Sequence, residues 1–250
     1  RATIFFFSSV TIIKIKIPVY KLYIIHKLRI VMIFFVKERR KNLLKFAQKI
    51  DCDTLVTFEP ENLFYMTGFW GEAIGILEKG GKTTIIAPEL EVGRVKEESE
   101  NCNVITSERG IGLISSLIDK IKNRKVCTDC QNYSTMVTLK KSIPTIKSST
   151  EPFYNSRIIK DEKEISILKK ASKIIDEMYD ICYKKMKVGQ KESELQTILM
   201  SYAMEQKMFD TGYKSTLNPL IIAGGPNGSL PHAQVTDRKF KKGDFVVVDL

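Results

Sequence analysis

The chain has 250 residues, of which 43% are hydrophobic and 28% are charged, a composition typical of an ordinary globular protein with one large domain or two smaller ones. The net charge of +11 is concentrated at the start, because residues 1–37 hold seven basic residues and no acid. The remainder has 33 basic residues against 29 acidic ones, so we expect neither nucleic acid nor a membrane as a partner.

The segment 1–36 differs in character from the rest of the chain. It is rich in Ile, Phe, Tyr and Lys, and its lysines and Arg29 break every apolar run before it reaches 18 residues, the length that spans a bilayer. Arg1 is not an initiator residue. We therefore expect this segment to be translated upstream sequence, with the true start at Met32; the alternative is a segment that lies on a membrane surface.

Strands alternate with helices between residues 37 and 150, which predicts an α/β domain with a largely parallel or mixed sheet. The segment 62–69 is expected to be a short helix or a turn that Gly68 closes. The other expected elements are helices over 37–50, 111–121 and 134–141, and strands over 54–58, 72–77, 82–87, 104–106, 125–127 and 143–146.

Five cysteines, an odd number, form no recognisable disulfide framework and favour a reducing, cytoplasmic compartment. Cys127 and Cys130 have the spacing of a redox or zinc pair. They have no second pair, and neither of the two histidines is near them in sequence. We interpret them as two incidental thiols at the end of a strand.

A polar break over 148–152 is the best candidate for a domain boundary, which gives a second domain over 151–250. Acidic residues at the start of 161–187 suit the positive end of a long helix, and a second helix is expected over 192–206. The inward stripe predicted for the first helix consists of Ile165, Leu168, Ala171, Ile175, Met178 and Cys182.

The segment 217–250 reads as a strand, a turn-rich stretch with His232, a basic hairpin and a second strand that ends in Asp249. Val246–Val248 are consecutive β-branched residues, so this strand is expected to be buried on both faces. A buried Asp249 would have to be paired, hydrogen-bonded or bound to a metal, although such a residue also caps helices or closes turns.

His232 follows Pro231 in a polar loop, where it is either an ordinary surface residue or a functional one. Gly224, Gly225 and Gly228 would let the backbone approach a ligand closely, and an imidazole can relay protons near neutral pH. Two further acidic residues, Asp210 and Asp237, are weaker candidates, and we interpret them as structural.

The order of these motifs carries a family resemblance. Ile221–Gly228, Pro231-His232, Lys242-Gly243-Asp244 and Val247–Leu250 together resemble the start of the catalytic core of the pita-bread metallopeptidases, which include Xaa-Pro aminopeptidase, prolidase and methionine aminopeptidase. Two further motifs, in 62–69 and 157–165, resemble the creatinase-like N-terminal domain and the entry to the catalytic domain. The resemblance implies a creatinase-like α/β domain over 37–150, followed by the first part of an α+β pita-bread domain that is truncated.

That resemblance also implies roles for two residues. Asp249 would be the first ligand of a site for two divalent metal ions, Mn²⁺, Co²⁺ or Zn²⁺, and His232 would contact substrate and help to move protons. The other family ligands, an aspartate, a histidine and two glutamates, are expected beyond Leu250, so we expect this chain alone to be inactive.

The function implied is that of an exopeptidase that cleaves bonds next to proline, either an Xaa-Pro aminopeptidase or an Xaa-Pro dipeptidase. Its partners would be proline-containing peptides or dipeptides and a second copy of the chain in a homodimer. Two alternatives share the fold: a hydrolase like creatinase, which works without metal, and a non-catalytic module that binds peptides or histones.

Overall fold

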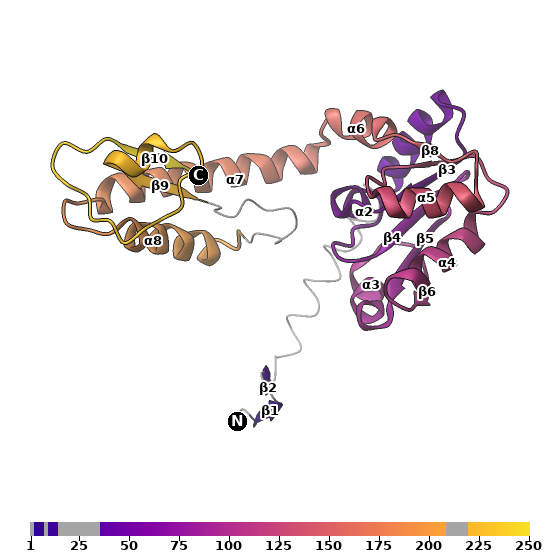
Figure 1. The fold of residues 1–250 in the computed structure, drawn as a ribbon, viewed down its shortest axis with the longest axis horizontal. Coiled ribbons are helices and arrows are strands. Elements are labelled where there is room, and N and C mark those ends of the chain that lie inside the picture. The colour runs from indigo at the N-terminus through magenta and orange to yellow at the C-terminus, as the bar shows by residue number, and fades with distance from the viewer. Residues whose placement is uncertain (1–2, 8–9, 15–35, 209–219) are drawn as a thin grey trace. The chain divides into compact units, whose positions relative to one another are not determined.

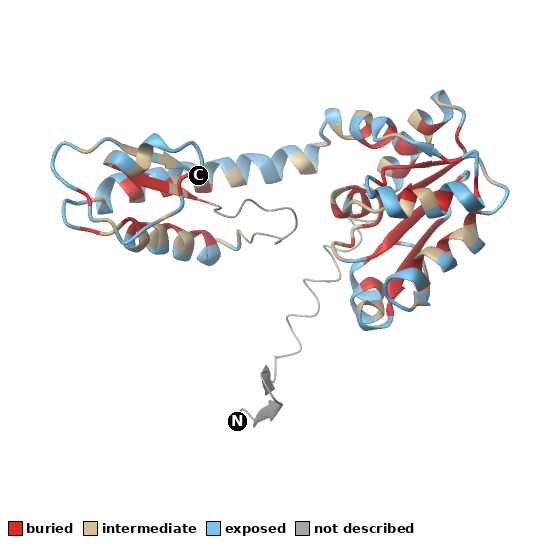
Figure 2. Ribbon diagram, in the orientation of Figure 1, coloured by how far each residue is buried: buried red, intermediate tan, exposed pale blue. Residues whose placement is uncertain are grey.

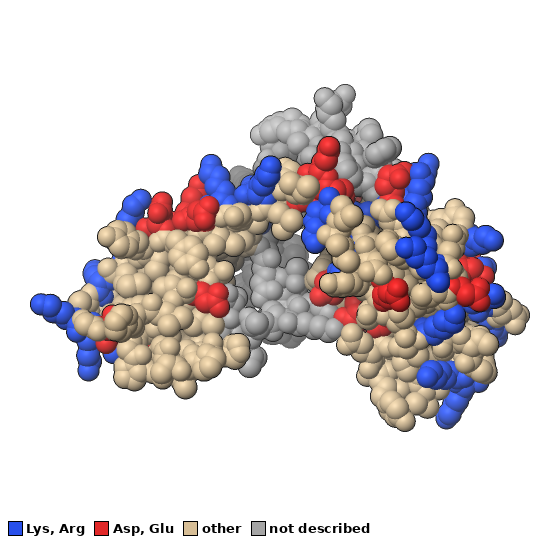
Figure 3. Space-filling model, turned by 90° about the horizontal axis from the view of Figure 1, so that it is seen from above, with Lys and Arg blue, Asp and Glu red and all other residues tan. Residues whose placement is uncertain are grey.

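The computed structural model describes residues 3–7, 10–14, 36–208 and 220–250. The chain divides into two compact units, Arg1–Ile159 and Lys160–Leu250 (Figure 1). On the face shown in Figure 3, Lys and Arg side chains lie among Asp and Glu on both units. Among the described residues, no helix is both long and apolar enough to cross a bilayer.

The first unit is built on a six-stranded mixed sheet with the order β6-β5-β4-β3-β7-β8. Strand β4 runs antiparallel to both of its neighbours, and the other neighbouring pairs are parallel. The mixed α/β sheet expected from the sequence is therefore confirmed. The strands are β3 (Thr54–Thr57), β4 (Ile74–Glu78), β5 (Thr83–Pro88), β6 (Asn103–Ser107), β7 (Val126–Thr128) and β8 (Lys147–Ser148).

Helices cover both faces of this sheet, whose strands are largely buried (Figure 2). Alternate side chains of one strand enter different cores: Leu55 belongs to one hydrophobic cluster and Val56 to the other. The first cluster takes residues from the helix formed by 36–49, α2 (Pro60–Thr67), α3 (Val92–Glu98) and α6 (Glu151–Ile158); the second takes them from α4 (Ile111–Ile121) and α5 (Tyr133–Ser142).

Helix α2 shows why its sequence folds as expected. Pro60 stands in the first turn, where its missing N–H group is not needed. Gly68 ends the helix with a left-handed backbone (φ 82°), and its N–H group donates to the Phe64 carbonyl at 2.8 Å. The segment predicted as a short helix or a turn is thus a helix with a glycine cap.

The first unit ends at Ile159 rather than at residue 150, so the expected boundary falls too early. The reason is helix α6, which the sequence reading did not predict. Its Phe153 is 1% exposed in the first core, and the Tyr65 hydroxyl donates to the Ser156 carbonyl at 2.8 Å. Helix α3 and the short 3₁₀ helix η1 (Glu89–Glu91) were also not predicted, and the strand expected over 143–146 is instead the two-residue β8.

Part of the segment 1–36 forms an antiparallel hairpin of β1 (Thr3–Phe7) and β2 (Val10–Lys14). Most of the segment, including Met32, lies outside the described residues. The expectation of a true start at Met32 therefore stays a prediction.

The second unit consists of two helices and a two-stranded sheet: α7 (Glu162–Lys185), α8 (Glu192–Glu205), β9 (Ile221–Gly224), the 3₁₀ helix η2 (Gly225–Ser229) and β10 (Val246–Asp249). Asp161 begins α7 with a capping box, in which its carboxylate accepts from the Glu164 N–H group at 2.8 Å. The core joins Met178, Leu195, Leu199, Ile222 and Phe240.

Two expectations about this unit are corrected. The apolar stripe of α7 packs inward only in the second half of the helix, because Ile165 and Leu168 are 42% and 54% exposed while Met178 is buried. Strand β10 is packed on one face rather than two: Val247 is 44% exposed and Asp249 is also exposed. In the described residues β9 and β10 form a sheet by themselves, and their alternate side chains point to opposite faces.

Candidate active site

The segment from Gly225 to Thr236, called here the His232 loop, follows β9 directly. Strands β9 and β10 are antiparallel, with Gly224 opposite Val246 and Ile221 opposite Asp249. The Gly225 N–H group donates to the Phe245 carbonyl at 2.8 Å, which extends this pairing by one step. The start of the loop and the strand that carries Asp249 are therefore tied together through backbone hydrogen bonds.

A buried carboxylate, that of Glu192, binds both ends of this loop. Glu192 begins helix α8, and it is 0% exposed. Its Oε1 accepts from the Gly224 N–H group at 2.7 Å. Its Oε2 accepts from Asn227 Nδ2 at 2.9 Å, from the Thr236 N–H group at 3.1 Å and from Thr236 Oγ1 at 2.6 Å. Four donors thus converge on one side chain.

The chain after the loop runs beside the start of α8. The Ser193 N–H group donates to the Thr236 carbonyl at 3.2 Å, and the Glu192 N–H group donates to the Arg238 carbonyl at 3.0 Å. Further along, the Phe240 N–H group donates to the Gln190 carbonyl at 2.9 Å. The bonds from Glu192 and Ser193 satisfy N–H groups that a helix start leaves without an intrahelical partner.

An ion pair supports the other side of the loop. Arg238 Nη1 and Nη2 lie 2.8 and 2.9 Å from Asp244 Oδ2 and Oδ1, a two-point contact. The hydrogen bond from Arg238 lowers the pKa of Asp244, and the Lys241 N–H group adds to this at 2.7 Å. The Lys-Gly-Asp motif is thus a turn whose aspartate binds Arg238.

The glycines of the motif are needed because the chain packs closely against itself. A Cβ atom on Gly224 would come within 2.7 Å of the Phe240 ring, and one on Gly228 within 2.9 Å of the Ala223 carbonyl oxygen. Gly225 has a φ of +53°, and a Cβ there would lie 2.6 Å from Arg238 Nη2. Close packing of the chain is therefore a sufficient reason for these glycines, and the expectation that they let the backbone approach a ligand stays a prediction.

His232 and Asp249, the two predicted site residues, are both exposed. His232 lies in a turn, and its neighbour Ala233 is buried. Within the described part of the chain, neither side chain makes a hydrogen bond or an ion pair, so both are available to a ligand. In the same residues, no group of three or more His, Cys, Asp or Glu side chains could hold a metal ion.

Of the two weaker candidates, Asp237 binds the start of α8. Its carboxylate accepts from Ser193 Oγ at 3.1 Å and lies 3.3 Å from Lys191 Nζ, and the hydrogen bond with Lys191 lowers its pKa. Asp210 lies outside the described residues. Sequence reasoning did not single out Glu192, because an acidic residue in a first helical turn is common and Glu194 fits the same pattern.

Both units of the chain match known protein families. Residues 39–159 match the creatinase/prolidase N-terminal domain, and residues 166–250 match metallopeptidase family M24. In this order the two matches, which together cover most of the chain, confirm the family resemblance of its motifs. The fold expected from the sequence, a creatinase-like domain followed by part of a pita-bread domain, is confirmed.

Two relatives of this chain are the Xaa-Pro dipeptidases of Pyrococcus horikoshii and Pyrococcus furiosus, 30% and 28% identical over 86% of this chain. The chain spans about 60% of the length of each. The crystal structure of the P. horikoshii prolidase superposes with a TM-score of 0.71 at 26% identity, covering 85% of this chain and 60% of that one. The P. furiosus prolidase gives 0.70 at 25%, with 84% and 64% covered.

The match of residues 166–250 to metallopeptidase family M24 implies divalent metal ions, and the chemistry of Asp249 fits such an ion. Its exposed carboxylate is the hard oxygen ligand that divalent cations take, and no other side chain of the described residues occupies it. The described part of the M24 domain brings no complete set of ligands to this carboxylate. The expected role of Asp249 as a metal ligand therefore stays a prediction, and the described residues alone do not form a metal site.

The Cys127 and Cys130 thiols of the creatinase-like domain do not form a metal or redox pair. Both are buried, but Cys127 belongs to the core on one face of the sheet and Cys130 to the core on the other. Burial raises the pKa of Cys127 to about 12. Their position agrees with the interpretation of two incidental thiols.

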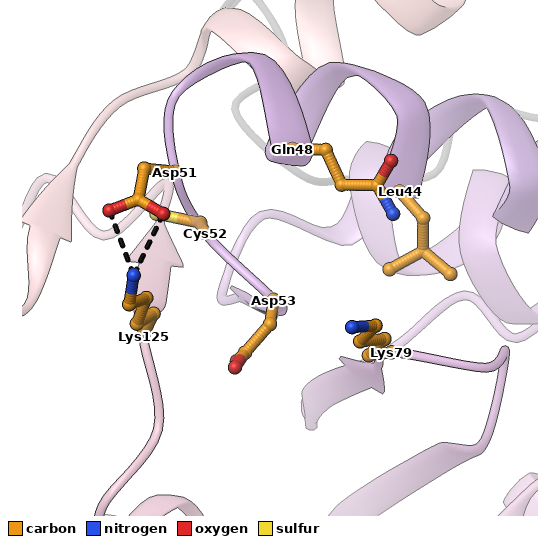
Figure 4. Close-up of a pocket in the computed structure, with 7 residues that line it drawn as sticks. All are labelled: Leu44, Gln48, Asp51, Cys52, Asp53, Lys79 and Lys125. Carbon is orange, nitrogen blue, oxygen red and sulfur yellow. Dashed lines mark hydrogen bonds and ion pairs between the residues drawn. The ribbon is translucent and has the colours of Figure 1, made fainter.

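The creatinase-like domain also holds a cavity of about 280 Å³ beside the starts of β3 and β7 (Figure 4). Its side chains carry charges of both signs. Lys125 Nζ donates hydrogen bonds to the two carboxylate oxygens of Asp51 at 2.9 and 3.0 Å. Asp53 and Lys79 also line it, with Leu44, Gln48 and Cys52. The cavity belongs to the first unit and shares no residue with the His232 loop.

Proposed function

We propose that the complete protein is a metal-dependent exopeptidase that hydrolyses peptide bonds next to proline. The match of residues 166–250 to metallopeptidase family M24 carries this proposal, because that range holds both His232 and Asp249. The relatives named Xaa-Pro dipeptidase, at up to 30% identity over most of this chain, favour dipeptides as substrates over longer peptides.

In this proposal Asp249 supplies one carboxylate to a site for two divalent ions, Mn²⁺, Co²⁺ or Zn²⁺. When bound, such ions lower the pKa of a water molecule and polarise a carbonyl group. Asp249 suits this role because its carboxylate is exposed and stands at the end of a strand whose register with β9 is fixed by backbone pairing.

His232 is proposed to bind the substrate and to move a proton. Its imidazole is exposed in a turn, while the loop around it is anchored at both ends by Glu192. A neutral imidazole can donate a hydrogen bond to a substrate carbonyl and can exchange protons near neutral pH. An exposed imidazole on a loop whose ends are fixed by hydrogen bonds suits this role.

The test is hydrolysis of Xaa-Pro dipeptides and longer Xaa-Pro peptides by the metal-loaded complete protein. Asp249→Ala should lose bound metal and activity together. His232→Ala should keep its metal and lose about 10²- to 10⁴-fold in rate, the range for one general acid–base group. Asp180→Ala, an exposed carboxylate change on α7, serves as the control.

Activity that survives in Asp249→Ala would show that the metal site is misassigned. A wild-type protein that is inactive on every such peptide would contradict the function and favour a metal-free, creatinase-like hydrolase or a peptide-binding module. On the ground of the family resemblance we also propose a homodimer, which light scattering on the purified protein would test. The five free cysteines support a cytoplasmic location, which fractionation of cells would test.

A further inference from the structure

The His232 loop is closed by a side chain rather than by its own backbone. Residues 225–236 leave β9 and return to the start of α8, and Glu192 accepts hydrogen bonds from Gly224 at one end and from Thr236 at the other. Asn227 adds a cross-link inside the loop, because its Nδ2 donates both to Glu192 Oε2 at 2.9 Å and to the Gln234 carbonyl at 3.1 Å. His232 lies between these attachment points.

The buried carboxylate of Glu192 depends on the loop for its hydrogen bonds. The side chain is fully buried, and all four of its partners are uncharged donors in the segment 224–236. A buried carboxylate is tolerated only where hydrogen bonds or charges satisfy it, so the loop must stay in place to keep Glu192 satisfied. Conversely, hydrogen bonds to a charged group are stronger than those between neutral groups, so Glu192 holds the loop firmly.

Glu194 provides a natural comparison on the same helix. It is also acidic and also in the first turn of α8, but it is exposed, and its carboxylate accepts from the Lys191 N–H group at 3.2 Å. Both glutamates interact favourably with the positive end of the helix. The contact with the His232 loop distinguishes Glu192 from Glu194.

We propose that Glu192 is a positioning residue for His232: its buried carboxylate fixes both ends of the loop and thereby sets where the imidazole meets the substrate. This inference rests on the proposed role of His232 in peptide hydrolysis. Misplacing a reacting group by about 1 Å can lower a rate by about 10²-fold, so the loop attachment is expected to matter for kcat/KM even though Glu192 does not touch substrate.

The decisive experiment is a double-mutant cycle in the complete, metal-loaded protein. Glu192→Gln keeps the shape but replaces one acceptor oxygen with an NH₂ group, so that donors face a donor whichever way the amide lies. We expect kcat/KM to fall by about 10²-fold in the wild-type background and to change little in the His232→Ala background. When the imidazole is absent, its misplacement can no longer lower the rate. Glu194→Gln should leave both backgrounds unchanged.

A purely structural role gives a different result. If Glu192→Gln lowers kcat/KM by the same factor with and without His232, or removes metal, it acts on the whole domain and the proposal is overturned. No effect in either background overturns it as well. Thr236→Val, which deletes one of the four donors at nearly constant shape, should lower kcat/KM in the same His232-dependent way, and Thr236→Ser, which restores the hydroxyl, should recover it.

Hydrogen exchange separates this inference from the proposed activity. In Glu192→Gln the backbone N–H groups of Gly224 and Thr236 should exchange faster, while those of the α7 core around Met178 keep their protection. If the wild-type protein hydrolyses no Xaa-Pro peptide, the proposed function fails, and faster exchange confined to the loop still supports Glu192 as its anchor. Unchanged exchange in the loop would overturn the anchoring role itself.

Discussion

A buried aspartate in the first unit offers a sharp test of how the sheet and its helices are joined. Asp129 follows β7, is 1% exposed, and accepts hydrogen bonds from Thr57 Oγ1 at 2.5 Å, from the Phe58 N–H group at 2.8 Å and from Asn62 Nδ2 at 2.7 Å. It therefore links the ends of two neighbouring parallel strands to the first turn of α2.

Asp129→Ala should remove the acceptor of all three donors at once. The Thr57 hydroxyl has a second acceptor, the Glu59 carbonyl at 3.3 Å, but the Phe58 N–H group and the Asn62 amide lose the partner they have here. Each donor left buried and unsatisfied costs about 1–3 kcal/mol, so the free energy of unfolding should fall by about 2–6 kcal/mol. Asp129→Asn should cost less, because the Asn62 Oδ1 atom is buried without a partner and can turn to accept from the new amide.

The dependence on pH has a definite sign. Burial raises the pKa of Asp129 above its usual value of 3.8, despite the hydrogen bonds it accepts from Thr57 and Phe58. Because the folded state then holds the proton more tightly than the unfolded state, stability falls as pH rises from the unfolded pKa to the folded one. Relative to wild type, Asp129→Asn should gain stability as pH rises through that window.

Urea unfolding followed by tryptophan fluorescence measures these effects directly. Trp70 is the single tryptophan of the chain and lies in the first unit, so its fluorescence reports on that unit. Asp119→Asn, on the exposed side of α4, serves as the control. A loss below about 1 kcal/mol for Asp129→Ala, or a greater loss for Asp129→Asn than for Asp129→Ala, would refute the reasoning from unsatisfied donors.

Three further predictions concern the rest of the chain. Leu195→Ala should cost about 2–5 kcal/mol in urea unfolding because Leu195 is 0% exposed, whereas Leu168→Ala, at 54% exposure, should change stability by less than about 0.5 kcal/mol. The pKa of Asp244 is lowered by Arg238, so its contribution to stability should be lost as pH falls through that lowered pKa, and melting curves of Asp244→Asn should lack this loss. With a pKa near 12, Cys127 should resist alkylation in the native protein and react once it is unfolded, which mass spectrometry of labelled peptides would show.

The sequence predicts best the features that are local. The helix over 111–121 depends on apolar spacing and coincides with α4, and the start of α7 depends on Asp161 and Glu164, which form a capping box within one turn. Both features involve residues that are near one another in the chain. The same reasoning explains the confirmed glycine cap of α2 at Gly68.

Features that depend on distant partners were missed or misjudged. Helix α6 packs into the first unit through Phe153 and Ser156, whose partners lie far away in sequence, so a polar stretch was taken for the domain boundary. Glu192 reaches residues 32 to 44 positions later, and no local pattern separates it from Glu194. A buried acceptor is visible only when its donors have been brought together by the fold.

Strand β10 shows how one such misjudgement changes the interpretation of the site. Three consecutive valines correctly predict a strand, but the number of buried faces depends on what packs against it. Val246 and Val248 contact the α7–α8 core, whereas Val247 and Asp249 share the exposed face. A carboxylate on that face needs no partner from the core, so the proposal that Asp249 binds a metal rests on its exposure and not on the buried charge expected from the sequence.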